Sequence, residues 1–336
     1  MKLLNTFGTY FQLLQSASLW YCLANAIDFR EKNFSVDLVF TGGDSLYDMP
    51  VKKTLEEIFE FFLNRDVSIN FYYGWSNIDY VHKRYALWIF PEYAAAKLVI
   101  SHRKNIPPII IYDDGLGSYV PWYKRFLWLM NYPNYRKNWL SIFGKYIWRS
   151  TSLLVLNRHI WRYRLFYYDG KSILPNNEVI SCYVNFMSEY CRYLEGSDIF
   201  NVNGKVAFFV GQSLIEEKIA EPLAYNRIVE IILAKLIRQY EYVYIKPHPR
   251  EDEKKYIRYS ELPNVIILPK DQKADCLLSI GKIDLVIGFS STLLLIAKHV
   301  YGLKTISVYN KGLCGDRCQA VYGLISKADI PIATID

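Results

Sequence analysis

At residues 244–250 the chain has the sequence YIKPHPR. The residues at 243–245 are β-branched or aromatic and predict the end of a strand, while Pro247 and Pro249 prevent regular structure from continuing. His248 is therefore expected on a stiff loop at the carboxyl end of a parallel strand, where ligands bind in doubly wound α/β domains. The alternative is an ordinary turn histidine between two prolines. We interpret His248 as a site residue, because two further motifs occupy similar positions.

On both sides of this loop, segments typical of strands alternate with segments typical of helices. Strands are expected at residues 34–41, 67–73, 106–112, 154–156, 179–181, 205–210, 243–245, 265–268, 285–287 and 304–308, and helices at 11–27, 51–64, 85–101, 222–238, 276–280, 293–300 and 319–336. This alternation predicts parallel sheets with helices on both faces. The fold class is therefore α/β, with two Rossmann-like domains facing a central cleft in which ligands bind.

The length of 336 residues is long for one hydrophobic core and favours two domains. Polar and glycine residues cluster between 195 and 204, so we expect the boundary there. The first Rossmann-like domain then covers residues 1–200, and the second covers residues 201–320. We expect the last segment, 321–336, to return to the first domain as a helix.

One segment, 121–168, interrupts the alternation and carries the positive charge of the chain. It contains fifteen aromatic and nine basic residues but no acidic one, whereas the whole chain has a net charge of +7. This composition suits an anionic membrane surface or a platform on which an acceptor sugar stacks. A third interpretation is a helical insert whose aromatic side chains form a core. Nucleic acid is the weakest candidate partner, because no recognition module is visible.

The sequence contains no apolar run of about 18 residues, the length that a membrane span needs. The first residues also lack the apolar stretch and the cleavage site of a signal peptide. We therefore expect a cytoplasmic protein, peripheral on the inner face of the cytoplasmic membrane if segment 121–168 docks there. The six cysteines show no CxxC spacing, and we expect them to be reduced, with a redox role for Cys314 and Cys318 as a remote alternative.

The second motif is IYDDGLGSY at residues 111–119. Asp113 and Asp114 follow a buried strand and precede Gly115, which frees the backbone for a sharp turn. Repulsion between the two carboxylates, together with partial burial, raises the pKa of one toward a value useful for accepting a proton. Metal binding is a poor alternative, because the acidic motif of metal-dependent nucleotide-sugar enzymes separates its acids by one residue. A turn with solvated aspartates explains the pair equally well.

The third motif is GFSST at residues 288–292, directly before an apolar helix. The hydroxyls of Ser290 and Ser291, with the backbone N–H groups of the helix start, suit a phosphate. A serine that only caps the helix explains one hydroxyl but not the whole set. Gly211 and Gln212, after the first strand of the second domain, form a fainter site of the same kind. The chain lacks a Walker loop and a GxGxxG fingerprint, so nucleotide hydrolases and nicotinamide enzymes are poor fits.

Together the motifs fit transfer from a nucleotide-activated sugar without a metal ion. The aspartate pair in the first half supplies a base for the acceptor hydroxyl. In the second half, the histidine and the serines supply hydrogen-bonding partners where negative charge develops on the leaving phosphate. We therefore expect the first domain on the acceptor side and the second on the nucleotide-sugar side.

In this order the three motifs resemble those of bacterial sialyltransferases, above all glycosyltransferase family 52, which includes lipooligosaccharide and capsule sialyltransferases. The similar strings are IYDDGLGSY, IKPHPR and GFSSTLLL, with TYFQLL near the start and IPIATID at the end. The similarity extends over most of the chain and is weakest at 121–200. It implies the GT-B fold, CMP-sialic acid as the donor, inversion at the anomeric carbon and no metal ion. The acceptor we expect is a galactose-terminated glycan of a lipooligosaccharide or capsule.

By position, the resemblance implies that Asp114 is the general base and that Asp113 supports it, although the sequence does not separate the two roles. His248 would contact the CMP phosphate and is a candidate acid. The residues expected at the donor are His248, Pro249, Arg250, Ser290, Ser291, Gly211 and Gln212. One departure concerns an acid that some family members carry just after the glycine that follows the first strand of the second half. Here residues 211–214 contain no acid, and the first one is Glu216.

Two other functions fit the sequence. The first is a transferase that uses another activated sugar, either CMP-linked or linked to a nucleoside diphosphate. The second is a non-catalytic component of surface-polysaccharide assembly that docks through segment 121–168. A homodimer is compatible with either function and with the sialyltransferase.

Overall fold

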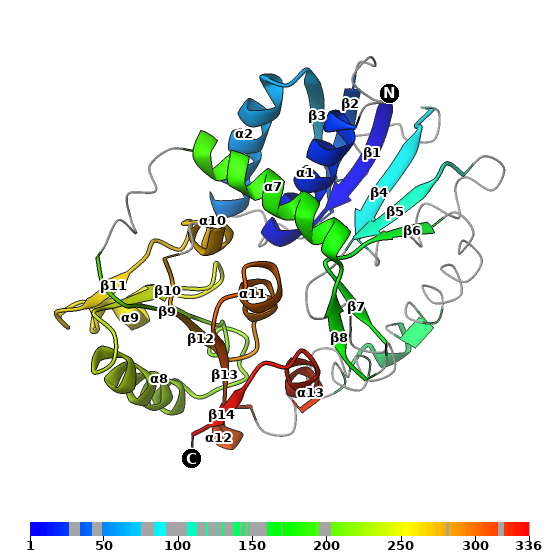
Figure 1. Ribbon diagram of the computed structural model, residues 1–336. Coiled ribbons are helices and arrows are strands. Elements are labelled where there is room, and N and C mark those ends of the chain that lie inside the picture. The colour runs from blue at the N-terminus through cyan, green and yellow to red at the C-terminus, as the bar shows by residue number, and fades with distance from the viewer. Residues whose placement is uncertain are drawn as a thin grey trace. The chain divides into compact units, whose positions relative to one another are not determined.

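The computed structural model describes residues 1–26, 34–41, 49–74, 84–91, 106–112, 119, 126, 130, 137–141, 143–144, 147, 160–169, 171–194, 203–279, 282–314 and 319–335. The chain divides into two compact units (Figure 1). Unit 1 comprises residues 1–165 and 176–193, and unit 2 comprises residues 166–175 and 194–336. The chain therefore passes between the units three times, where the sequence analysis expected one boundary near residue 200.

Unit 1 contains a six-stranded parallel sheet in the order β3-β2-β1-β4-β5-β6. Its strands are β1 (Lys2–Phe7), β2 (Phe34–Phe40), β3 (Val67–Tyr73), β4 (Leu87–Pro91), β5 (Ile109–Tyr112) and β6 (Ile160–Tyr163). The central strands β1 and β2 are buried along nearly their whole length, as expected for strands covered on both faces. The strand order reverses between β1 and β4, which is the arrangement of a doubly wound domain.

Three described helices pack over this sheet. They are α1 (Tyr10–Asn25), α2 (Met49–Leu63) and α7 (Asn177–Tyr193), which lie side by side in Figure 1. Helix α1 begins at Thr9, whose hydroxyl accepts a hydrogen bond from the Gln12 N–H at 3.3 Å. The ring of Phe62 meets Trp20 edge-on at 5.7 Å between centroids and stacks on Phe186 at 6.4 Å. Aromatic packing therefore joins all three helices.

Two segments of unit 1 differ from the sequence-based expectation. Residues 179–181, expected as a strand, lie inside α7, whose buried residues recur at helical spacing from Val179 through Tyr183 to Tyr190. Residues 87–91, expected within a helix over 85–101, form the buried strand β4. A short apolar run has no periodicity that separates a buried strand from a buried helix. The strand expected at 154–156 lies outside the described residues.

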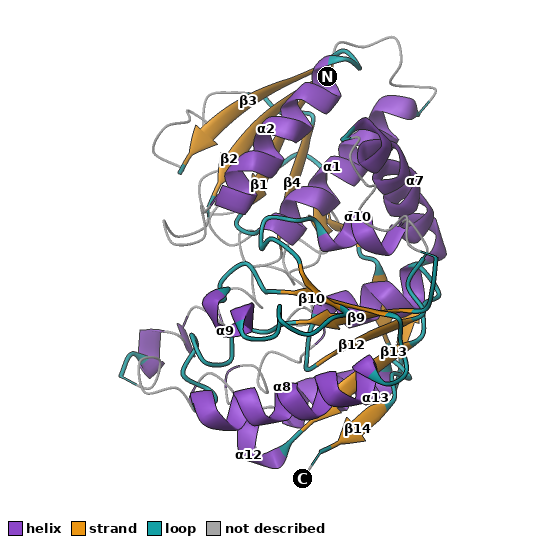
Figure 2. Cartoon of the chain, turned by 90° about the vertical axis from the view of Figure 1, so that its left-hand side faces the viewer, coloured by secondary structure: helices purple, strands orange, loops and turns teal. Residues whose placement is uncertain are grey.

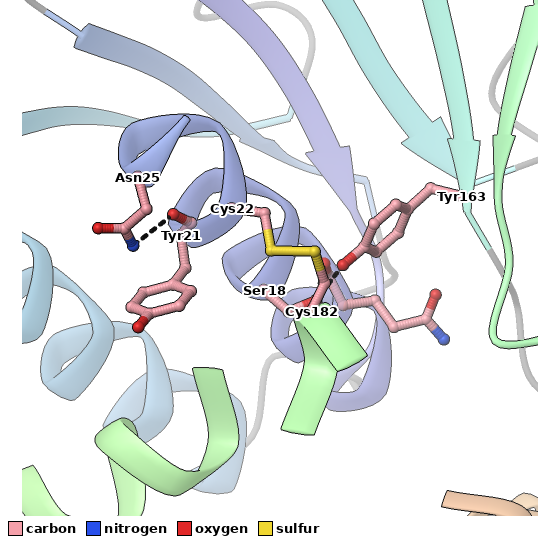
Figure 3. Close-up of a disulfide and its surroundings, with 7 residues drawn as sticks. Ser18, Tyr21, Cys22, Asn25, Tyr163 and Cys182 are labelled. Carbon is pink, nitrogen blue, oxygen red and sulfur yellow. Dashed lines mark hydrogen bonds between the residues drawn. A yellow bond between two sulfur atoms is a disulfide. The ribbon is translucent and has the colours of Figure 1, made fainter. Parts of the chain in front are cut away.

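A disulfide joins Cys22 of α1 to Cys182 of α7 (Figure 3). The expectation of reduced cysteines is therefore wrong for this pair. The two residues are separated by 160 positions in the sequence, and only the packing of α7 on α1 brings them together. Cys191 and Cys276 do not take part in a disulfide.

Unit 2 repeats the architecture with a second parallel sheet, in the order β11-β10-β9-β12-β13-β14. Its strands are β9 (Val206–Val210), β10 (Tyr242–Lys246), β11 (Val265–Ile267), β12 (Leu285–Gly288), β13 (Thr305–Tyr309) and β14 (Ile332–Thr334). Its helices are α8 (Pro222–Ile237), α9 (Lys254–Ile257), α10 (Ala274–Ser279), α11 (Thr292–Leu295), which continues as a π-helix (Ile296–Val300), α12 (Lys311–Cys314) and α13 (Gln319–Lys327). Figure 2 shows α8 lying along this sheet.

The C-terminal segment belongs to unit 2. The helix expected over 319–336 ends as α13, because Asp329 adopts a positive φ of 55° and Pro331 follows it. The remaining residues form β14, which pairs in parallel with β13. They therefore complete the second sheet at its edge.

A hairpin of β7 (Phe166–Tyr168) and β8 (Ile173–Pro175) also belongs to unit 2, although the chain on both sides of it belongs to unit 1. Its base packs on unit 2, where Phe166 meets the ring of His299 at 5.9 Å. The Lys327 ammonium donates a hydrogen bond to the Tyr168 hydroxyl at 2.5 Å. In the sequence, residues 166–168 are not distinguished from the rest of the basic and aromatic segment 121–168.

Most of segment 121–168 lies outside the described residues. Of its described aromatic side chains, Phe126 and Phe143 pack against each other with centroids 5.3 Å apart. Trp139 is 48% exposed and Trp161 is 67% exposed, so these two do not belong to a core. Within the described residues the segment therefore combines packed and exposed aromatic side chains. No described helix is long and apolar enough to span a membrane.

Candidate active site in unit 2

The candidate site is built from three loops that follow neighbouring strands. The loop after β9 begins at Gly211, the loop after β10 contains His248, and the loop after β12 contains Ser290. Strands β10, β9 and β12 are adjacent and parallel, so their carboxyl ends share one edge of the sheet. All three loops were predicted as site elements, because each directly follows a strand in the sequence.

The His248 loop is a tight turn closed by two backbone N–H groups. The Glu251 N–H donates to the His248 carbonyl at 2.9 Å, and the Arg250 N–H donates to His248 Nδ1 at 3.2 Å. Because Nδ1 accepts a hydrogen bond, the proton of the neutral ring resides on Nε2. Burial lowers the pKa of His248 to about 3, and the positive charges of Arg250, Lys246 and Lys255 add to this effect. In the ligand-free protein His248 is thus a neutral ring whose Nε2–H is a donor.

Lys246, the last residue of β10, fixes the start of the same loop. Its ammonium donates to the carbonyls of Pro247 at 2.7 Å and of Lys270 at 2.9 Å. Burial lowers the pKa of Lys246 to about 8, against the opposing effect of carboxylates led by that of Glu251. At neutral pH the ammonium is charged, and it ties the His248 loop to the loop that follows β11.

The two serines of the third motif have different contacts. The Gln212 side chain clamps Ser290, since its Nε2 donates to Ser290 Oγ at 2.9 Å and its Oε1 accepts from the Ser290 N–H at 2.9 Å. The Ser291 hydroxyl accepts from the Leu293 N–H at 3.2 Å and caps α11. The helix-capping interpretation therefore holds for Ser291. Ser290 Oγ, by contrast, accepts from Gln212 Nε2 at 2.9 Å and donates to Gln212 Oε1 over a longer distance of 3.3 Å. A ligand oxygen can replace Oε1 as the acceptor of this hydrogen.

Arg250 is half exposed, and its guanidinium contacts Glu217 Oε1 at 2.9 Å. The Ser213 hydroxyl donates to the same carboxylate at 2.8 Å. The neighbouring Glu216 accepts from Lys255 at 3.3 Å. The first two acids after Gly211 therefore form ion pairs, Glu217 with Arg250 of the His248 loop and Glu216 with Lys255 of α9. A phosphate bound at Arg250 would share the guanidinium with Glu217.

Unit 2 thus brings together seven of the residues expected at the donor. They are His248, Pro249, Arg250, Ser290, Ser291, Gly211 and Gln212. The two aspartates expected as base and support, Asp114 and Asp113, lie outside the described residues, directly after β5. Among the described residues, no group of three or more His, Cys, Asp or Glu side chains is arranged to hold a metal ion.

Glu251, a buried residue that is 3% exposed, was not expected from the sequence. Its Oε2 accepts from the His248 N–H at 2.6 Å. The signal was present in the sequence, because an acid three residues after the start of a turn can accept from the first N–H, as in a capping box.

Residues 81–310 of the chain match the family model described as alpha-2,8-polysialyltransferase (POLYST). The chain belongs to this family. The match covers more than half of the sequence and includes all three motifs. It confirms the expectation of a sialyltransferase, and it specifies a polysialyltransferase family where the sequence analysis named family 52. The protein is therefore a glycosyltransferase of a sialyltransferase family.

Solved structures with similar folds include a 2,6-sialyltransferase from Vibrionaceae Photobacterium sp. in a ternary complex with CMP and lactose. It has a TM-score of 0.56 and 10% identity, covering 99% of this chain and 78% of that one. The UDP-GlcNAc 2-epimerase of Neisseria meningitidis bound to UDP-GlcNAc has a TM-score of 0.53 and 14% identity, covering 91% and 82%. The S. aureus MnaA–UDP structure has a TM-score of 0.52 and 11% identity, covering 92% and 79%. These similarities confirm the GT-B fold for this polysialyltransferase-family chain. No curated protein sequence matches it.

Proposed function

We propose that the protein transfers sialic acid from CMP-sialic acid to a sugar hydroxyl, with inversion and without a metal ion. The observation that carries the proposal is the edge of unit 2, in a chain of a sialyltransferase family. There, the Nε2–H of neutral His248 and the Oγ–H of Ser290 belong to loops that are hydrogen-bonded into place. Such fixed donors stabilise negative charge as it develops on a leaving phosphate.

In the proposed reaction, an oxygen of the acceptor sugar attacks the anomeric carbon of sialic acid from the face opposite the CMP phosphate. The bond between that carbon and the phosphate oxygen breaks, and its electron pair stays on CMP. The proton of the acceptor hydroxyl passes to a carboxylate, which we assign to Asp114 with support from Asp113 on the basis of the family resemblance. His248 donates its Nε2–H to the phosphate.

The bound phosphate also changes the chemistry of His248. A nearby negative charge favours the imidazolium, so donor binding raises the pKa of His248 from its low value in the free protein. The ring then acts first as a neutral hydrogen-bond donor and gains acid character only in the donor complex. Arg250, which is already paired with Glu217, contributes charge at the rim of the site.

For the acceptor, we propose a galactose-terminated glycan of a lipooligosaccharide or capsule. A second candidate is a glycan that already ends in sialic acid, and the description of the matched family as an alpha-2,8-polysialyltransferase favours it. The two differ in product, because a sialic acid acceptor permits repeated addition. Incubation with CMP-sialic acid and either lactose or sialyllactose, followed by NMR of the product linkage, separates them.

We also propose that the protein is cytoplasmic and contacts an anionic membrane surface through segment 121–168. A homodimer is compatible with this membrane contact. The exposed Trp139 and Trp161, together with exposed Lys137 and Arg162, support the membrane contact. Charge reversal at Lys137 and Arg162 is expected to reduce co-sedimentation with phosphatidylserine vesicles and to leave neutral vesicles unaffected. Equal binding to both vesicles at all salt concentrations would refute the electrostatic contact.

The donor is tested by calorimetric titration with CMP, UMP, UDP and GDP, each with and without a chelator. Selective CMP binding that a chelator does not change supports the proposed donor. Preference for a diphosphate, or a strict metal requirement, indicates another activated sugar. The absence of any nucleotide binding supports a non-catalytic role in polysaccharide assembly.

A further inference from the structure

The Glu251 carboxylate is the most densely bonded acidic group near the candidate site. Its Oε2 accepts from the His248 N–H at 2.6 Å, and its Oε1 contacts the Lys255 ammonium at 2.5 Å. Oε1 also accepts from the hydroxyls of Tyr256 at 3.0 Å and Tyr225 at 3.1 Å. Four donors from three segments of unit 2 therefore converge on one carboxylate whose side chain is buried.

The Glu251 carboxylate also requires a glycine at position 211, directly after β9. A Cβ atom on Gly211 would lie 2.2 Å from Glu251 Oε2 and 2.6 Å from the Tyr256 hydroxyl. No side chain larger than hydrogen fits there without moving the carboxylate. The Gly211 backbone and Glu251 are therefore in direct contact, and the acid beside the glycine comes from the loop after β10.

The contacts continue to the third loop. The Gln212 backbone also acts on the Tyr225 hydroxyl, and the Gln212 side chain clamps Ser290. A continuous set of contacts therefore runs from His248 through Glu251, Tyr225 and Gln212 to Ser290. It spans the carboxyl ends of all three adjacent strands.

Burying an ion pair such as Glu251–Lys255 costs free energy of desolvation. Desolvating a carboxylate and an ammonium costs several kcal/mol per ion, and well-packed apolar side chains of similar size are often as stable or more stable. Unlike an apolar side chain, the Glu251 carboxylate fixes the direction of each hydrogen-bond donor that contacts it. The His248 N–H is one of these donors, and it sets the orientation of the turn that carries the imidazole.

From this geometry we propose that Glu251 is a positioning residue for the donor phosphate. It holds the His248 turn, and thereby the Nε2–H tautomer, and through Tyr225 and Gln212 it sets the place of Ser290. The inference rests on the proposed function to the extent that His248 and Ser290 meet the leaving phosphate. The effect of Glu251 on the tautomer of the His248 ring does not depend on a bound ligand.

The experiment compares Glu251→Gln with Glu216→Gln in the full chain. Glu216 contacts the same Lys255 ammonium at 3.3 Å and accepts from the Asp252 N–H at 3.0 Å, so it is a matched carboxylate. It has no contact with the His248 N–H. Three quantities are measured well below the melting temperature: the tautomer of His248 from the ¹⁵N shifts of its ring, the Kd for CMP, and kcat/KM. The His248→Gln variant identifies the ring signals.

We expect Glu251→Gln to convert the single Nε2–H tautomer into a mixture, to raise the Kd for CMP about tenfold and to lower kcat/KM about 100-fold. Glu216→Gln is expected to stay within about twofold of the wild type in all three. A merely structural role predicts that both variants melt at a lower temperature while tautomer and Kd stay unchanged. That result would overturn the proposal.

If Glu251→Gln does not fold, Tyr256→Phe replaces it, because this change removes one donor to Glu251 and leaves His248 untouched. We expect the same direction with about a threefold rise in the Kd for CMP, and an unchanged tautomer and Kd would refute the positioning role. Failure of the proposed function is distinguishable. A wild type that binds no CMP disproves the donor, whereas the tautomer measurement needs no ligand and still decides the role of Glu251.

Discussion

Protonation of His248 in the ligand-free protein is expected to destabilise the fold. Burial beside Arg250, Lys246 and Lys255 lowers the pKa of His248 to about 3, compared with 6.5 for an unperturbed ring. Because the pKa is lower in the folded state, the folded protein binds fewer protons than the unfolded chain between these two values. The stabilisation is therefore complete above the unfolded pKa and is lost as the pH falls toward the folded pKa.

The magnitude follows from these two pKa values. Linkage gives a loss of about 2 kcal/mol of unfolding free energy between pH 7.5 and pH 5. The ring is only partly buried, and screening by solvent reduces this to roughly 1 kcal/mol. The assay is urea denaturation at both pH values for the wild type and for His248→Gln, whose side chain gains no proton. The difference between the two pH effects isolates His248, since the other titrating groups are common to both proteins.

An equal loss of unfolding free energy in both proteins between the two pH values would refute the predicted effect of His248. A direct check is the ¹⁵N titration of the ring in the free protein, where His248 is expected to stay neutral at pH 5. A midpoint near 6.5 would show that the ring is solvated and that Arg250 and Lys255 do not act on it. Addition of CMP is expected to raise the midpoint, because the phosphate stabilises the imidazolium.

Three further perturbations test other parts of the molecule. Asp114→Asn is expected to lower kcat about 1,000-fold with little change in the Kd for CMP, because the base acts on the acceptor; equal losses in both would remove Asp114 from that role. Gln212→Ala is expected to raise the Kd for CMP about tenfold, because it removes both hydrogen bonds to Ser290. Gln212→Glu keeps the oxygen that accepts from the Ser290 N–H and loses the N–H that donates to Ser290 Oγ. A Kd for CMP that neither variant changes would show that these hydrogen bonds do not serve nucleotide binding. Replacing Cys22 and Cys182 with serine is expected to lower the unfolding free energy by about 3 kcal/mol under non-reducing conditions, and dithiothreitol should lower the wild type to the same level; a wild type insensitive to dithiothreitol and equal to the variant would show that the thiols are not joined.

Several elements of unit 2 could be predicted from local patterns. Strands β9, β12 and β13 are short runs rich in β-branched and aromatic residues, and the structure places each within one or two residues of its expected bounds. The same holds for the three site loops, since a motif directly after a strand lies at the carboxyl end of the sheet in any parallel arrangement. In unit 1, β3 (Val67–Tyr73) was predicted in full for the same reason.

Other elements depend on contacts that are distant in sequence. The strand β1 (Lys2–Phe7) was not expected, and it becomes the centre of its sheet only by pairing with β2 and β4. Helix α7 forms where a strand was expected, because its aromatic face packs on α1 and α2. The hairpin β7–β8 and the strand β14 belong to unit 2 through contacts with residues such as His299 and through pairing with β13.

The sequence by itself determined the α/β class, the two sheets and the place of the seven candidate residues on loops after strands, because strand periodicity and turn chemistry act over a few neighbouring positions. The tertiary structure decided which distant residues meet: Cys22 with Cys182, Gln212 with Ser290, and Glu251 with Gly211. It also decided that His248 is neutral, since a pKa depends on burial and on charges from every segment packed around the ring. These properties arise from long-range packing, which no local pattern in the chain encodes.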